Sequence, residues 1–357
     1  MAKPTVGVIG LGYGRAHIPA FQAHGCPVVA VSQRDEAAAR KVAAAYGVPE
    51  IFTRWEALLE RARPEVVVIA TPPHLHLPIA QAALAAGAHV LCEKPLARSR
   101  AEGEAMVEAA RRAGRVAMTA FNWRFPAGMQ RLHALLAEGA VGRPLHVVAR
   151  WLNPRWADEE AAPTWRMDLS QAGHGAMGDA GVHLVDMLRW NLGEIRRVCA
   201  QTGIAYPART VPGGGRAADA EDVCTVLGEL ASGAQLTLSV SRAAHGVNEH
   251  ALEVYGTGGA LAYRLGRETA RWYEGELRAA RPGSLLAPVE IPPTETRTGD
   301  QLDVIGRATI APLVALLLEA IDRGGVASPS LEDGLRAQVV LDAVLESARR
   351  RAWVDVA

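Results

Sequence analysis

Hydrophobic positions in the first 120 residues form short continuous runs that alternate with stretches of helical periodicity. The runs are rich in Val and Ile and are bounded by Gly or Pro, which is typical of strands buried on both faces of a sheet. This alternation predicts a parallel sheet with helices on both faces. The expected strands are Val6–Ile9, Val28–Val31, Val66–Ala70, Val90–Cys92 and Val116–Met118.

Two of the helical stretches begin with a capping pattern. Ser99 is followed three residues later by Glu102, and Thr53 by Glu56. In this arrangement each side chain accepts a hydrogen bond from the backbone N–H of the other residue. The sequence therefore predicts helices with Thr53 and Ser99 at their N-caps.

The pattern changes beyond residue 121. Between about residues 198 and 291, short apolar runs alternate with turns, and Ser232-Gly233 separates two runs as in a β-hairpin. Such a pattern is typical of an antiparallel sheet. Helical periodicity lies on either side of this region, around Pro126–Glu138, Asp179–Leu192, Ile310–Arg323 and Leu331–Arg350.

Composition limits the classes of function. Lys and Arg number 38 together, as do Asp and Glu, so the formal net charge is zero. Nothing in this balance favours nucleic acid or an anionic membrane as a partner, and no single apolar run reaches membrane-spanning length. The four cysteines lack CxxC spacing, so neither a zinc site nor a disulfide framework is indicated. No signal-peptide pattern is present, and we expect a cytoplasmic protein.

A glycine-rich segment, Gly10-Leu11-Gly12-Tyr13-Gly14, lies between the first expected strand and a helix. Its glycines let the backbone turn tightly and approach a phosphate, and the helix N-terminus offers free N–H groups. The usual third glycine of this motif falls at Arg15, so the chain departs from the pattern there. The alternative is an ordinary glycine turn, but the strand before and the helix after favour a dinucleotide site.

These features predict an α/β protein of two domains. Residues 1–121 are expected to form a Rossmann-type, doubly wound parallel sheet that binds NAD(P). Residues 122–357 are expected to form an α+β domain on an open, mostly antiparallel sheet. Its last helix is expected to pack back toward the first domain.

The end of the second expected strand reads Ser32-Gln33-Arg34-Asp35. An acid here would bind the ribose hydroxyls of NAD, whereas Arg would bind the 2′-phosphate of NADP. The acid is absent from the expected position, and Ser32 and Arg34 can both bind a phosphate. The alternative is a solvated Arg34 beside an Asp35 that caps the next helix. The sequence favours NADP, with NAD as the alternative.

The tripeptide Glu93-Lys94-Pro95 directly follows the expected strand Val90–Cys92. Open α/β sheets bind ligands at the carboxyl ends of their strands, so Lys94 can reach the reacting end of a bound dinucleotide. A surface lysine is the alternative. The proline that follows restricts the backbone of Lys94, which favours a fixed, functional position.

Oxidation of a secondary alcohol needs a base for the hydroxyl proton and a positive group beside the developing alkoxide. Asp179 and His183 are spaced four residues apart, which places them on one face if they share a helix. The alternatives are a packed histidine and an N-cap aspartate. One helix makes a poor metal cage, so no metal is expected.

Together these residues resemble the Gfo/Idh/MocA family of NAD(P)-dependent oxidoreductases, which act mostly on sugars, inositols and related polyols. The resemblance covers nearly the whole chain and implies a cis peptide between Lys94 and Pro95. Besides Glu93-Lys94-Pro95 it rests on 70–76 (ATPPHLH), Asn122-Trp123-Arg124-Phe125, 178–183 (GDAGVH) and 253–259 (EVYGTGG).

The resemblance implies roles for individual residues. His183 is expected to be the proton-accepting base, Asp179 to orient it or contact substrate, and Lys94 to polarise the reacting oxygen. Arg124, Trp165 and Arg166 are expected to bind substrate, with packing between domains as the alternative. Beyond the glycine loop, Ser32 and Arg34, the expected cofactor-binding residues are Thr71, Pro72, His76, Glu93, Lys94 and Asn122.

The expected activity is hydride transfer between NAD(P) and a secondary hydroxyl of a sugar, cyclitol or polyol. Two alternatives stay open: glycoside hydrolysis that retains NAD, and a non-catalytic sensor with the same fold. The resemblance also implies a homodimer or homotetramer that forms through the C-terminal sheet.

Overall fold

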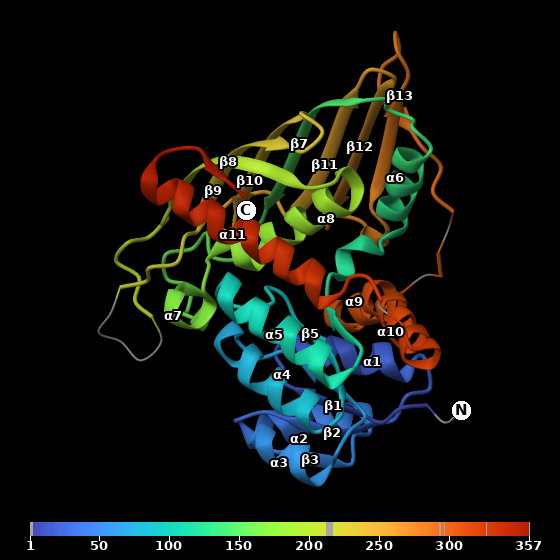
Figure 1. The fold of residues 1–357 in the computed structure, drawn as a ribbon, viewed down its shortest axis with the longest axis vertical. Helices are drawn as coiled ribbons and strands as arrows, with labels where there is room; N and C mark the ends of the chain where they lie inside the picture. The colour runs from blue at the N-terminus through green and yellow to red at the C-terminus, as the bar shows by residue number, and fades with distance from the viewer. Residues whose placement is uncertain (1–2, 212–216, 293, 296, 326, 357) are drawn as a thin grey trace. The chain divides into compact units, whose positions relative to one another are not determined.

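The computed structural model describes residues 3–211, 217–292, 294–295, 297–325 and 327–356 (Figure 1). Contacts divide the chain into two compact units. The first comprises Met1–Phe125 and Arg297–Arg336, and the second comprises Pro126–Thr296 and Ala337–Ala357. The sequence-based division put everything after residue 121 in one domain, whereas the structure returns the stretch 297–336 to the first unit.

The first unit contains a six-stranded parallel sheet in the order β3-β2-β1-β4-β5-β6. The two central strands, β1 and β4, contain only buried residues, as their continuous apolar runs predict. The strand order reverses between them, which is where open α/β sheets bind ligands. The strands are β1 (Val6–Ile9), β2 (Val28–Ser32), β3 (Glu50–Phe52), β4 (Val66–Ile69), β5 (His89–Cys92) and β6 (Ala117–Thr119).

Five α-helices connect these strands, and α4 and α5 lie side by side in Figure 1. Short 3-10 segments follow β1, β4 and β6 at the carboxyl edge of the sheet. The helices are α1 (His17–Gln22), α2 (Glu36–Tyr46), α3 (Trp55–Arg61), α4 (His76–Ala85) and α5 (Arg100–Ala113), and the 3-10 segments are η1 (Gly14–Ala16), η2 (Pro73–Leu75) and η3 (Asn122–Arg124).

The capping prediction is confirmed at α5 and wrong at α3. Ser99 Oγ accepts a hydrogen bond from the backbone N–H of Glu102 at 3.4 Å. Helix α3 instead begins after Arg54, which makes no side-chain cap bond. The reason is β3, an edge strand that the sequence did not predict. Because β3 keeps the chain extended as far as Phe52, Thr53 belongs to the connection and not to the helix start.

The C-terminal part of the first unit is a continuous helical segment. It consists of α9 (Gln301–Ile305), a π-helical turn η7 (Gly306–Ile310) and α10 (Ala311–Arg323). The helix Gln301–Arg323 has 23 residues, and its most apolar 18-residue stretch has a mean hydropathy of 1.9. By length and composition alone it is apolar enough to cross a membrane, which contradicts the expectation that no run reaches that length. About 61% of the most apolar stretch is buried, as in the core helices that pass the same test.

The second unit contains a nine-stranded sheet in the order β14-β13-β12-β11-β7-β10-β9-β8-β15. Its pairs are antiparallel except β10 with β7, and the predicted β9–β10 hairpin is confirmed. The strands are β7 (Pro144–Leu152), β8 (Ile195–Gly203), β9 (Val223–Leu230), β10 (Gln235–Ser241), β11 (Glu249–Gly256), β12 (Gly259–Gly266), β13 (Glu276–Ala280), β14 (Ala287–Pro288) and β15 (Val354–Asp355).

One face of this sheet packs against helices α6 and α8 (Figure 1). Burial alternates along β9, whose inward residues Cys224 and Val226 are buried while Val223 and Leu227 on the opposite face are exposed. The helices of this unit are α6 (Ala127–Ala137), α7 (Leu169–Ala172), α8 (Val182–Leu192) and most of α11 (Leu331–Arg350). A π-helical turn, η5 (Met177–Gly181), directly precedes α8. Two 3-10 segments, η4 (Trp165–Met167) and η6 (Trp272–Glu274), lie in its loops.

Candidate functional site

The glycine loop leaves the carboxyl end of β1 in a conformation that suits a phosphate. Gly10 has φ +89°, and a Cβ there would lie 2.5 Å from Ala70 O, so only glycine fits this turn. A Cβ at Gly12 would meet no atom within 4 Å. The backbone at Gly12 therefore borders open space that a side chain would fill, and this cradle fits the pyrophosphate of a dinucleotide.

The departure from the usual glycine pattern has a structural explanation. A Cβ at Gly14 would lie 2.8 Å from Ala70 Cβ, so Gly14 provides the close packing of helix on strand that the third glycine usually provides. Arg15 is thereby released to the surface, where its guanidinium lies 2.8 Å from Asp300 Oδ1. Tyr13 precedes η1, and the backbone N–H of Leu11 donates to Gln33 Oε1 at 3.4 Å.

The end of β2 offers no acid for the ribose hydroxyls. Ser32 is buried, with 3% of its surface exposed, and Arg34 is exposed. Asp35, the only acid in this turn, caps α2 by accepting a hydrogen bond from the backbone N–H of Ala38 at 3.0 Å. The capping alternative for Asp35 is therefore confirmed, and Arg34 is the charged side chain nearest in sequence to the expected 2′-ribose position.

Glu93 is held in the interior beside the glycine loop. Its Oε1 lies 2.8 Å from Nε2 of His17, the first residue of α1, and both side chains are buried. Its Oε2 accepts a hydrogen bond from the backbone N–H of Lys94 at 3.2 Å. A buried carboxylate needs such partners. The Glu93 carboxylate thus links the helix that follows the glycine loop to the backbone of the candidate catalytic lysine.

The peptide between Lys94 and Pro95 is cis, as the family resemblance implied. Lys94 is partly exposed at the carboxyl end of β5, and its neighbours Glu93 and Pro95 are buried. The lysine therefore lies at the same sheet edge as the glycine loop.

The loop after β4 carries Thr71, Pro72 and two histidines. His76 is completely buried, with Nε2 2.9 Å from Thr71 O and Nδ1 3.1 Å from Leu96 O. Burial lowers the pKa of His76, against the opposing effect of these two carbonyl groups. His76 therefore fixes this loop against the segment that follows Lys94. The side chain of His74 is partly buried.

Asn122 is anchored by the C-terminal part of the first unit. Its Nδ2 donates to Thr309 Oγ1 at 2.7 Å, and Thr309 Oγ1 donates to Ile305 O at 2.8 Å. Thr309 lies in the π-helical turn η7, and such turns often occur at functional sites. A Cβ at Gly306 in the same turn would lie 2.2 Å from Ala16 O, so this turn also packs closely against η1.

Arg124 is buried, and its Nη1 donates to Ser328 Oγ at 2.9 Å. Its Nη2 lies 3.9 Å from Asp333 Oδ1. Both partners of the Arg124 guanidinium therefore belong to the first unit. A substrate-binding role for Arg124 stays a prediction.

Asp179 and His183 lie in one continuous helical segment of the second unit, but only His183 lies in regular α-helix. Asp179 lies in the π-helical turn η5, and His183 lies in the first turn of α8. The Nε of Arg166 lies 3.3 Å from Asp179 Oδ1, and both side chains are about one-fifth exposed. The Asp179 carboxylate therefore has a cationic neighbour and remains accessible.

The imidazole of His183 is the outer member of a row of stacked rings. Its centroid lies 5.4 Å from that of Trp151 on β7, with 23° between the planes. On β11, His250 stacks on Trp151 at 4.3 Å. Burial lowers the pKa of His250 well below its usual value, which leaves its imidazole neutral at neutral pH. Trp151 therefore supports the ring of the candidate base.

The two arginines that interact with the Asp179 carboxylate, Arg166 and Arg155, each lie over a tryptophan ring. Arg166 lies over the ring of Trp165 at 4.2 Å, and Arg155 over Trp156 at 4.6 Å. Desolvation lowers the pKa of Arg155, and the carboxylate of Asp179 opposes that shift. Arginine donors beside aromatic faces suit the hydroxyls and rings of sugars.

The predicted residues thus gather in two groups, one in each unit. The glycine loop, Glu93, Lys94, His76 and Asn122 belong to the first, and Asp179, His183, Trp165 and Arg166 to the second. Within the described residues, no group of three or more His, Cys, Asp or Glu side chains could hold a metal. The sequence did not predict the supporting roles of His17, Trp151 and Thr309.

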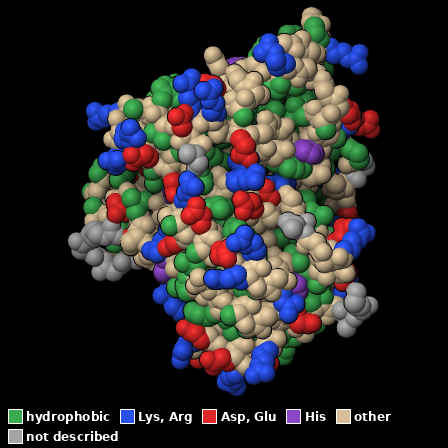
Figure 2. Space-filling model, in the orientation of Figure 1, with side chains coloured by type: hydrophobic (Ala, Val, Ile, Leu, Met, Phe, Trp, Pro, Cys, Tyr) green, Lys and Arg blue, Asp and Glu red, His purple; other side chains and the backbone are tan. Residues whose placement is uncertain are grey.

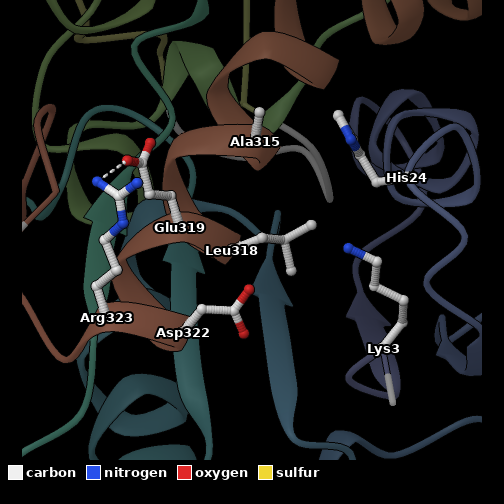
Figure 3. A pocket seen from close by; sticks show the side chains of 7 residues that line it. All are labelled: Lys3, His24, Ala315, Leu318, Glu319, Asp322 and Arg323. Atoms are coloured by element: carbon white, nitrogen blue, oxygen red, sulfur yellow. Dashed lines mark ion pairs between the residues drawn. The ribbon is translucent and has the colours of Figure 1, made fainter. Parts of the chain in front are cut away.

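A surface hollow of about 290 Å³ lies apart from these groups, beside α10 in the first unit (Figure 3). In Figure 3, Leu318 points toward the space where Lys3 lies, while Glu319 pairs with Arg323. None of the residues predicted to bind cofactor or substrate lines it.

Comparisons with known proteins extend this picture. Residues 5–121 match a model described as an oxidoreductase family with an NAD-binding Rossmann fold, and residues 129–262 match a GFO/IDH/MocA C-terminal domain. The chain is 32% identical over 100% of its length to levoglucosan dehydrogenase of Pseudarthrobacter phenanthrenivorans, covering 99% of that protein. It is 29% identical over 98% of its length to inositol 2-dehydrogenase of Pseudomonas fluorescens, covering 96% of that protein.

Solved structures agree with these matches. A levoglucosan dehydrogenase in complex with NADH and levoglucosan superposes with a TM-score of 0.89 at 31% identity, over 99% of this chain and 100% of that one. An oxidoreductase domain protein from Kribbella flavida superposes with the same TM-score, 0.89, at 31% identity, with both chains fully covered.

Proposed function

The chain belongs to the GFO/IDH/MocA family of NAD(P)-dependent oxidoreductases that act on sugar and polyol hydroxyls, and on this premise we propose how its residues do so. Lys94, Asp179 and His183 carry the chemistry, which is reversible hydride transfer between NAD(P) and a secondary hydroxyl of a sugar or cyclitol. The glycine loop, Thr71, Pro72, His76, Glu93 and Asn122 form the cofactor site.

One observation supports this proposal above the others. The buried contact between His17 and Glu93 joins the helix after the glycine loop to the backbone of Lys94. A nucleotide site alone would not require a lysine fixed in this way. The contact instead suits a lysine that must stay in register with the reacting end of a dinucleotide.

Bound NAD(P) would supply the hydride acceptor for oxidation of the carbinol carbon, and the hydride donor in the reverse direction. His183 takes the hydroxyl proton as general base, with its ring held by the stacked Trp151. The ammonium of Lys94 stabilises the negative charge that develops on the same oxygen. Asp179 orients His183 or accepts a substrate hydroxyl, and Arg166 and Trp165 hold the sugar.

A panel assay tests the activity. Levoglucosan, myo-inositol and D-xylose, each incubated with NAD⁺ or NADP⁺, are expected to yield reduced nicotinamide for at least one sugar, measured by its near-ultraviolet absorbance. Cleavage of a glycoside without accumulation of reduced nicotinamide would identify the redox-neutral alternative. Binding of sugar with neither conversion would identify a sensor.

Cofactor preference is a separate prediction. NADPH is expected to bind at least about tenfold more tightly than NADH, because Arg34 can pair with a 2′-phosphate and such a charge-assisted contact contributes roughly 1.5–3 kcal/mol. Fluorescence titration measures both affinities. Arg34→Ala is expected to remove the preference for NADPH. Arg40→Ala serves as the control and is expected to keep it, because Arg40 is an exposed arginine of α2 that pairs with Glu36.

Equal affinities for the two cofactors, or tighter binding of NADH, would refute the preference for NADP. The similar levoglucosan dehydrogenase structures contain NADH, which makes NAD the alternative.

We also propose that the chain forms a homodimer or homotetramer through the sheet of the second unit. Val223 and Leu227 project from the face of that sheet opposite α6 and α8, and Leu227 is 52% exposed. Figure 2 shows acidic and basic side chains interspersed on the face that it draws, a pattern that does not favour nucleic acid as a partner there. Light scattering is expected to give at least twice the mass of the monomer. Leu227→Glu is expected to lower the measured mass. A monomeric mass for the unchanged protein would contradict the proposal.

A further inference from the structure

We propose that the acidic pair Glu221-Asp222, which lies just before β9, positions both sides of the contact between Asp179 and Arg166. Glu221 holds the helix start that carries Asp179, and Asp222 holds the loop that carries Arg166. Both are therefore positioning residues for the reaction. This inference rests on the proposed roles of Asp179 and His183.

Glu221 binds three consecutive backbone N–H groups ahead of the candidate base. Its Oε2 accepts from Gly175 at 2.8 Å and its Oε1 from Met177 at 3.0 Å. Its backbone carbonyl accepts from Ala176 at 2.7 Å. The first N–H groups of a helix have no partner within the helix and carry partial positive charge. A carboxylate that is 5% exposed therefore caps this helix start from a different part of the chain.

Two glycines allow this close approach. A Cβ at Gly175 would lie 2.0 Å from Glu221 O, so no other residue fits there without displacing the helix start. A Cβ at Gly181 would lie 2.6 Å from Met177 Sδ and 3.3 Å from Val240 Cγ2, so the π-helical turn packs tightly against β10. Asp179 lies between these two glycines, and its backbone N–H donates to Gly175 O at 3.0 Å. The place of Asp179 is therefore set from both ends.

Asp222 acts on the other partner through Arg242. Arg242 Nε donates to Asp222 Oδ1 at 2.7 Å, and both side chains are almost completely buried. Arg242 Nη1 donates to the backbone carbonyl of Arg166 at 3.0 Å. Arg166 in turn contacts Asp179 at 3.3 Å. The chain of contacts from Asp222 thus ends at the same carboxylate that Glu221 positions from the helix side.

The physical argument favours positioning over stability. A buried ion pair such as Asp222–Arg242 contributes little net stability, because desolvation offsets the attraction. Its geometry is nevertheless specific, and catalysis loses rate steeply when a reacting group moves by about 1 Å. Two adjacent acids that fix the two elements of one polar contact fit that requirement.

Glu221→Gln is the first test. It keeps the size of the side chain but removes the charge and places an NH2 group against a backbone donor. We expect kcat to fall about 10–100-fold, as for displacement of a reacting group, while KM for the nicotinamide cofactor stays within about twofold. The assay uses the sugar from the panel that gives the highest rate. Glu229→Gln is the control, since Glu229 lies on β9 a short way along the chain from Glu221 and pairs with Arg196 and Arg197. It is expected to leave kcat unchanged.

A double variant separates positioning from a general loss of fold. If Glu221 acts through Asp179 and His183, Glu221→Gln is expected to have little further effect on kcat in a His183→Ala background. A merely structural role would lower kcat by the same factor in both backgrounds. Equal factors, or an unchanged kcat in Glu221→Gln itself, would overturn the proposal. If His183→Ala alone keeps its turnover, the proposed function fails instead.

Arg242→Lys provides a second variant should Glu221→Gln fold poorly. It keeps the buried positive charge but loses the fork that reaches Arg166 O. A fall in kcat of about tenfold or more at unchanged KM for the cofactor is expected, and the same turnover as the wild-type protein would contradict the role of Asp222 and Arg242.

Discussion

Replacing His183 with Ala is expected to lower kcat by about 10²–10⁴-fold, which is the usual contribution of a positioned general base. The loss follows from removing the group that takes the hydroxyl proton while the nicotinamide takes the hydride. Trp151 and the helix start stay in place, so the affinity for cofactor is expected to be unchanged. Steady-state rates with the best sugar from the panel measure the loss, and fluorescence titration measures the affinity.

The chain offers a matched control for this variant. His133 also stacks on a tryptophan in the second unit, with 3.8 Å between its centroid and that of Trp190. Its ring also contacts Asn191, with Nδ1 3.1 Å from Oδ1. His133→Ala is expected to keep kcat within about twofold, because it has no place in the proposed reaction. Near-normal turnover in His183→Ala would remove His183 from the role of base.

Lys94→Ala is expected to reduce kcat by about 10²–10³-fold, the cost of removing one donor to a developing oxyanion. The backbone at this position is held by the Glu93 carboxylate and by buried Pro95, so the fold is expected to survive the change. A small amine added to the assay is expected to restore part of the rate, because it can occupy the space of the missing ammonium. Rates with and without the amine give the measurement.

Lys41→Ala is the control for Lys94→Ala, since Lys41 is an exposed lysine of α2. It is expected to leave kcat unchanged. If Lys94→Ala matches this control, Lys94 binds or stabilises without taking part in the reaction, and the catalytic assignment is wrong.

The sequence predicted the sheet of the first unit well because its central strands are buried on both faces. Such strands appear as continuous Val- and Ile-rich runs that need no knowledge of partners. It missed β3, whose three residues EIF include one exposed and one partly buried residue at the edge of the sheet. An edge strand of this length has no distinctive apolar pattern, and only its pairing with β2 defines it.

The pattern of hydrophobic residues along the chain could not predict that residues 297–336 belong to the first unit. The sequence predicted a helix around Ile310–Arg323, which corresponds to α10, but it did not predict α9 and gave no indication of which core α10 would join. The contacts that decide it are long-range, namely Asp300 with Arg15, Thr309 with Asn122, and Gly306 with Ala16.

Within the site, motifs identified the candidate reacting residues but not their supports. The contact between Glu93 and His17 could have been predicted from the sequence. An acid at the buried end of a strand needs a hydrogen-bond donor, and His17 follows the glycine loop at the same edge of the sheet. Glu221 had no such signal. An acid just before a strand has the same sequence pattern as a solvated surface residue, and only the fold brings it to the helix start at Gly175.

The central proposal is that Lys94 and His183 act on the same substrate oxygen. The most direct test compares kcat of Lys94→Ala, His183→Ala and the double variant, assayed with one sugar and one cofactor. Residues that act together on one group lose their effects non-additively, so the double variant is expected to be about as slow as the slower single variant. Losses that multiply would show that the two residues act independently, and would contradict the account.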